Sequence, residues 1–207
     1  MDEQSDKIQL DIATTYNNLG TIYRKIGDYE KDTTAYTIAL KYLWDALNIR
    51  KNILGENHPL VASVYNNLSN VYDSKYDYEK SLKYSQMDIN IVKEVYGEDH
   101  PDLAISYGNI ALTYKRMKNY EQAMIYNKLA LQLKLKYYPE ISTTVGGTYN
   151  NMGTLYYMMG DLSQAHQYLS KAYNIISQIM GEEHKLAKII KGHIADVEEE
   201  LKSKNEL

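Results

Sequence analysis

The chain has 207 residues, of which 44% are hydrophobic and 24% charged, a composition typical of a globular protein with a buried core. Its formal net charge is only −4 and its lysines and arginines are spread along the sequence, so we expect no nucleic-acid or anionic-membrane surface. The lack of cysteine excludes disulfides, zinc–thiolate sites and a thiol nucleophile, and a polar start without any long apolar run predicts a cytoplasmic location.

One pattern occurs four times along the chain. It begins with tyrosine, continues with one or two asparagines, a large apolar residue and a small residue, and ends with a second tyrosine seven positions after the first. The copies begin 49, 42 and 42 residues apart, at Tyr16, Tyr65, Tyr107 and Tyr149. A repeated period of this length indicates a solenoid of similar structural units.

Within each copy the large residues and the small residue fall on one stripe of an α-helix. The small residue leaves room for a second helix to approach closely; these residues are Gly20, Ser69, Ala111 and Gly153. The second helix supplies alanines seven residues apart, Ala123 with Ala130 and Ala165 with Ala172, whereas repeat 2 has Ser81 and Asp88 instead. Each repeat is therefore predicted to be a helical hairpin.

The first and last predicted elements depart from the common repeat. Seven extra residues in the first repeat, at about 32–38, are expected to lengthen its second helix by almost two turns without rotating its buried face. The last helix has Lys191 and Glu198 in place of the tyrosines but keeps Ile194 and Ala195 as a buried pair, as expected of a capping helix. The segments are repeat 1 at about 8–55, repeat 2 at 59–97, repeat 3 at 101–138, repeat 4 at 141–181 and the capping helix at 184–203.

Glycine and proline mark the turns between repeats. Gly55 and Gly97 are expected to end one hairpin, and Pro59 and Pro101 to open the next. Histidine recurs at the same turns, at positions 58, 100 and 184, but helices pack 8–10 Å apart, so successive hairpins place these rings too far apart to share a metal. We expect turn and capping roles for the histidines, and no metal or cofactor.

The framework of tyrosine, leucine, small residue and tyrosine, followed by an alanine pair, resembles tetratricopeptide repeats. The 42-residue period, the Gly-Glu-x-His-Pro turn and the Tyr-Asn-Asn-Leu start are similar to the variant found in kinesin light chains. The resemblance covers about residues 10–195. It implies an all-α, right-handed superhelical solenoid of about nine helices forming a single domain, and a non-catalytic adaptor that binds a protein or peptide.

In such a stack the first helices of the hairpins line the concave face. In each copy of the pattern, the asparagine two positions after the first tyrosine lies beside the buried stripe on the helix surface. Its amide can therefore form hydrogen bonds with the backbone of a bound peptide. These residues are Asn18, Asn67, Asn109 and Asn151. The resemblance supports this role, and the alternative is that the asparagines bond locally between helices or meet solvent.

Further residues are predicted on the same face. They are Thr21, Arg24, Lys25, Asn70, Leu112, Lys115, Arg116 and Tyr157. Because arginine presents a fork of donors to carboxylates, the two basic pairs favour an acidic peptide. The alternative is that these cations complement the carboxyl ends of their helices.

No set of residues typical of catalysis occurs in the sequence, so we expect no enzymatic activity. The competing functional class is a self-associating structural or regulatory module. In such a module two copies would pair as a homodimer through Trp44 and the long helix of repeat 1. Trp44 is expected to be either exposed or packed on its own repeat.

Overall fold

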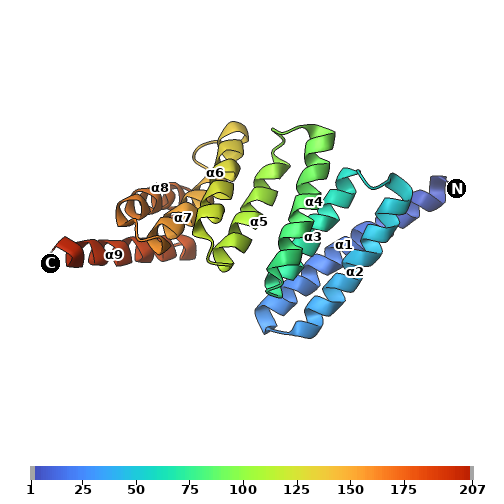
Figure 1. Cartoon of the computed structure of the whole chain (residues 1–207), viewed down its shortest axis with the longest axis horizontal. Helices are drawn as coiled ribbons and strands as arrows, with labels where there is room; N and C mark the ends of the chain where they lie inside the picture. Colours follow the sequence, from blue (N-terminus) through green and yellow to red (C-terminus); the bar gives the residue numbers. More distant parts are fainter. Residues whose placement is uncertain (1–2, 206–207) are drawn as a thin grey trace. The chain divides into compact units, whose positions relative to one another are not determined.

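The computed structural model describes residues 3–205, and within them the chain folds into nine α-helices (Figure 1). The all-α prediction is confirmed. The helices are α1 (Glu3–Glu30), α2 (Thr33–Leu54), α3 (Pro59–Ser74), α4 (Tyr78–Tyr96), α5 (Asp102–Arg116), α6 (Tyr120–Tyr137), α7 (Thr143–Met158), α8 (Leu162–Met180) and α9 (Lys185–Asn205). None of the described helices is both long and apolar enough to cross a membrane.

The helices belong to two compact units, one ending at Thr113 and the other beginning at Tyr114. In the first unit, α1 packs on α2 and α3 on α4 as hairpins, and α3 also contacts α1 and α2. In the second unit, α7 forms a hairpin with α8, α6 packs on α7, and α9 packs on α8. Each unit thus repeats the same helix-on-helix contact.

Small residues allow the two helices of a hairpin to approach closely, as predicted. A methyl group added at Gly20 would lie 2.6 Å from Leu43 Cγ on α2, and one at Gly153 would lie 2.7 Å from Leu169 Cγ and 2.9 Å from its backbone nitrogen. Leu43 and Leu169 are fully buried. The glycines therefore set the spacing of their hairpins.

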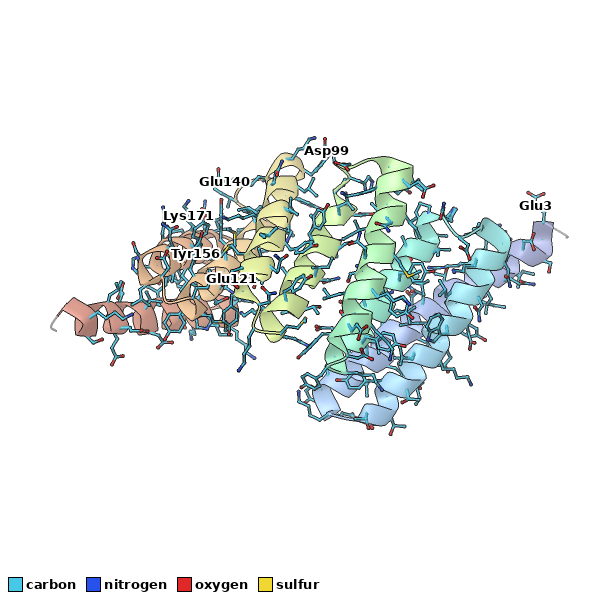
Figure 2. All side chains as sticks on the ribbon, viewed as in Figure 1. Glu3, Asp99, Glu121, Glu140, Tyr156 and Lys171 are labelled. Carbon is cyan, nitrogen blue, oxygen red and sulfur yellow. The ribbon has the colours of Figure 1, made fainter. Side chains whose placement is uncertain are left out.

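Tyrosines fill the space beside this contact. In three hairpins, one tyrosine of the second helix packs against both framework tyrosines of the first, with ring centroids 5.3–6.0 Å apart. The three central tyrosines are Tyr42, Tyr84 and Tyr168. Lys171, labelled with Tyr156 in Figure 2, adds its ammonium 5.5 Å from the Tyr168 ring centroid. These aromatic contacts join the two helices of each of these three hairpins.

The second hairpin is joined by buried hydroxyl groups as well. Ser69 Oγ lies 3.2 Å from Ser81 Oγ and 2.6 Å from Ser85 Oγ, and Ser81 Oγ lies 3.1 Å from Thr113 Oγ1. Thr113 Oγ1 is also 3.0 Å from Asp73 Oδ1. Repeat 2 therefore replaces the alanine contact with a satisfied polar network.

The turns between repeats use the predicted residues. Gly55 and Gly97 have φ of 84° and 88°, and each donates its N–H to the carbonyl four residues earlier. His58 Nδ1 accepts a hydrogen bond from the Leu60 amide at 3.1 Å, and the rings of His100 and His184 accept in the same way. The recurring histidines therefore cap helix N-termini.

Two details differ from the sequence-based interpretation. The extra residues of repeat 1 are shared by both helices, since α1 continues to Glu30 and α2 already begins at Thr33. In α9, Ala195 is exposed and Ile194 only partly buried, whereas Ala187, Ile190 and Val197 are buried. Among the described helices α9 packs on α8 and α7. It buries only the positions that correspond to Val145, Thr148 and Leu155 of α7, so its buried stripe is narrower than that of α7.

Candidate peptide-binding surface

The asparagines at the repeat starts connect neighbouring first helices. Asn67 Nδ2 on α3 donates to Asn17 Oδ1 on α1 at 2.8 Å, and Asn109 Nδ2 on α5 donates to Asn66 Oδ1 on α3 at 3.4 Å. Asn67 and Asn109 are partly buried. An asparagine amide can form four hydrogen bonds, so each residue keeps capacity for a ligand while serving the contact between repeats.

The other two predicted asparagines, Asn18 and Asn151, are exposed. Among the further polar residues on this face, Asn70 donates to Asn66 at 3.3 Å, and the hydroxyl of Thr21 is bonded to the carbonyl of its own helix at Asn17. These side chains lie at the surface of the first helices.

The predicted basic residues of repeat 1 differ from each other. Arg24 forms an ion pair with Asp28, at 2.5 Å between Nη1 and Oδ2, and Asp28 also accepts a hydrogen bond from the Tyr36 hydroxyl at 2.9 Å. Lys25 is exposed. Arg24 is thus already neutralised within its hairpin, whereas Lys25 is the more exposed residue of this pair.

In the second unit, Lys115 and Tyr157 line one pocket of about 240 Å³, together with Thr154, His193 and Asp196. The Lys115 ammonium is partly buried and lies 3.0 Å from the neutral Thr154 hydroxyl, and burial lowers its pKa. His193 Nδ1 is buried and has no hydrogen-bond partner among residues 3–205. Two polar groups here are therefore incompletely paired.

Three further predicted residues remain. Leu112 is 44% exposed and Arg116 is exposed. The Tyr157 hydroxyl is influenced by Glu200 of α9, whose negative charge raises the pKa of the phenol. Sequence reasoning missed His193, although it lies 42 residues after Asn151 and so occupies the asparagine position of the capping helix.

A second pocket, of about 260 Å³, lies in the first unit between α3, α4 and α5. Asn67 is the predicted site residue that lines it, and Asp88 and Ser106 are polar lining residues that were not predicted as site residues. Asp88 is 4% exposed. It could have been recognised because it replaces an alanine of the second-helix framework.

Trp44 makes a contact with the second repeat that the sequence did not indicate. Its ring is partly buried and makes an edge contact with Tyr84 of α4, with centroids 5.9 Å apart. The tryptophan ring thus contacts the next repeat and is not fully exposed.

Comparison with known proteins identifies the repeats. Tetratricopeptide repeat models match residues 12–60, 75–136 and 145–184, which together make up most of the chain. A comparison with curated proteins gave no match.

Solved structures with the same fold include kinesin light chain-like proteins. The Podosopora anserina putative kinesin light chain with nearly identical TPR-like repeats is 14% identical, with a TM-score of 0.75 over 93% of this chain and 88% of its own. BtubC (BKLC) from P. vanneervenii is 18% identical, with a TM-score of 0.64 over 91% and 82%. Aspartyl phosphate phosphatase F from Bacillus subtilis is also 18% identical, with a TM-score of 0.69 over 95% of this chain but only 51% of its own. The chain belongs to the tetratricopeptide repeat family, whose members generally serve as non-catalytic scaffolds for protein–protein interaction.

Proposed function

We propose that the protein is a cytoplasmic, non-catalytic adaptor that binds an extended peptide segment of a partner along the first helices of its hairpins. The segment carries an acidic side chain that enters the pocket formed by Lys115, Tyr157 and His193. The asparagines Asn18, Asn67, Asn109 and Asn151 bond the peptide backbone.

The observation that carries this proposal is the state of the Lys115 ammonium. Among the described residues it is hydrogen-bonded to the neutral Thr154 hydroxyl, and no ion pair with a carboxylate neutralises it. A partly buried cation without an anion is unfavourable, and a ligand carboxylate would both neutralise it and raise its pKa. The unpaired Nδ1 of His193 supplies a second hydrogen bond when its tautomer carries the proton there.

The chemistry of this pocket favours one acidic side chain over a large ligand. Its volume of about 240 Å³ lies below the ~300–1,000 Å³ of pockets that hold drug-sized molecules. Asp196 also lines the pocket and would repel a second negative charge. We therefore expect a single aspartate or glutamate, or a terminal carboxylate, at this point of the ligand.

A displayed library of random peptides tests the proposal. Wild-type protein is expected to enrich sequences with an acidic residue at a fixed position, and Lys115→Gln is expected to lose this enrichment. Lys128→Gln is the matched control, because Lys128 is exposed on the second helix of the same repeat. Equal acidic enrichment by both variants would exclude Lys115 as the recognition residue.

A triple variant with alanine in place of Asn67, Asn109 and Asn151 tests the peptide groove as a whole. It is expected to lose most of the binding to selected peptides while retaining its helical circular dichroism. Unchanged binding would instead favour the competing prediction of self-association through repeat 1 and Trp44. In that case sedimentation equilibrium of the wild type would show a mass that increases with concentration.

A further inference from the structure

The buried carboxylate of Asp88 has no part in the acidic-peptide site and belongs to the other unit. It stands at a position where the other repeats have Ala46, Ala130 and Ala172, each fully buried. Asp88 is almost as buried, at 4% exposure. A charged group therefore occupies a place where the fold itself requires only a methyl group.

The partners of Asp88 leave one carboxylate oxygen unused. Ser106 Oγ and Asn66 Nδ2 both donate to Oδ2, the latter at 3.2 Å. Both donors are neutral, and among the described residues Oδ1 receives no hydrogen bond from the protein. A carboxylate can accept several hydrogen bonds through its two oxygens, so Oδ1 is free to accept one from a ligand.

The space beside this carboxylate has the size and character of a side-chain pocket. Its volume is about 260 Å³, and its walls include Ala62, Val92, Tyr96 and Ile105. Asp102 adds a second carboxylate, and no lysine, arginine or histidine among residues 3–205 lines the pocket. Apolar walls with acidic groups complement a side chain that has an aliphatic stem and a cationic end.

We propose that this pocket receives a basic side chain of the bound segment, lysine or arginine, with its charged end at Asp88 Oδ1 and its stem against Val92 and Ile105. The inference rests on the proposed function and extends it to the first unit.

The affinity of this pocket for a basic side chain is expected to fall as the pH is lowered. The pKa of Asp88 is raised to about 6. Burial is the main cause and the charge of Asp102 on α5 adds to it, while the hydrogen bonds from Ser106 and from Asn66 on α3 oppose the shift. On the α4 side the pocket is faced by Tyr96, whose ring stacks on His100 at 4.3 Å. The ionised carboxylate binds the cation, so affinity is high above pH 6 and falls as Asp88 is protonated.

The test uses n-butylguanidinium as a probe for the basic side chain and n-butylurea, a neutral molecule of similar shape, as its control. Both are titrated into the full chain labelled with nitrogen-15, and the backbone amides of Asn66, Asn67 and Ser106 are followed by NMR. The cation is expected to shift these amides in a saturable manner at pH 7.5 and to bind about tenfold more weakly at pH 5, where about a tenth of Asp88 is ionised.

Asp88→Asn keeps the shape of the side chain and is expected to abolish the saturable shifts and their pH dependence. Asp73→Asn removes an equally buried acid outside the pocket and is expected to bind as the wild type does. The proposal would be overturned if the urea bound equally well, if Asp88→Asn bound undiminished, or if the pH dependence persisted in this variant. None of these results would alter the selection of acidic peptides through Lys115.

Discussion

Replacing Gly153 by alanine tests the closest helix contact in the second unit. The change gains about 1 kcal/mol of helix propensity. The new methyl group would lie 2.7 Å from Leu169 Cγ and 2.9 Å from the Leu169 backbone nitrogen. The side chain of Leu169 can rotate but its backbone cannot, and overpacking of this kind costs about 1–3 kcal/mol. We expect Gly153→Ala to be less stable than the wild type by up to about 2 kcal/mol.

Gly147 provides the matched control because it lies in the same helix and has no atom within 4 Å of the position of an added methyl group. Gly147→Ala is expected to stabilise the protein by about 1 kcal/mol through helix propensity alone. Urea unfolding followed by far-ultraviolet circular dichroism measures both changes, and hydrogen exchange of α7 and α8 localises them. If Gly153→Ala proved as stable as Gly147→Ala, close helix approach would not explain the small residue of the repeat.

Three further predictions concern buried or capping residues. The pKa of Asp88 is raised from its ordinary value of 3.8 to about 6 in the folded protein, so the wild type loses stability as pH rises between these values. The difference in free energy of unfolding between Asp88→Ala and the wild type should therefore shift by about 2–3 kcal/mol in favour of the variant between pH 4 and pH 7.5 in urea unfolding. Arg50 Nη1 donates hydrogen bonds to the Leu60 carbonyl at 2.7 Å and to Ser63 Oγ at 2.9 Å. Arg50→Ala should therefore lower the free energy of unfolding by about 2–4 kcal/mol in the same assay. A decrease below about 0.5 kcal/mol would show these bonds to be unimportant. His58→Ala should lower the thermal midpoint through a loss of about 1 kcal/mol at the N-terminus of α3, and His58→Asp should restore it.

Local features of the fold could be predicted from the sequence because they depend on residues close together in the chain. Helix periodicity located the hairpins, and the glycine and histidine positions identified the close contact at Gly153 and the cap at His58. The division of the extra residues in repeat 1 was not predictable. A seven-residue insertion preserves the buried face of a helix wherever it is placed, so periodicity alone could not assign it to the second helix or to both.

Contacts between repeats were harder to predict than those within them. The Asn67–Asn17 bond depends on how far one hairpin is displaced on the next, a quantity that no motif encodes. Asp88 was visible as an exception to the alanine framework, but its pocket required the positions of α3 and α5 beside α4. The sequence therefore identified Asp88 as a polar exception in the repeat framework, and the packing of α3, α4 and α5 showed the pocket that it lines.

The most direct test of the proposed function is a double-mutant cycle between Lys115 and the acidic residue of a selected peptide. Fluorescence polarisation would measure the affinity of wild type and Lys115→Gln for the peptide and for its version with the acid replaced by the corresponding amide. A coupling energy of about 1–3 kcal/mol is expected, because the two charges meet in a partly buried pocket. A coupling near zero would contradict the account, since the acidic residue would then be recognised somewhere other than at Lys115.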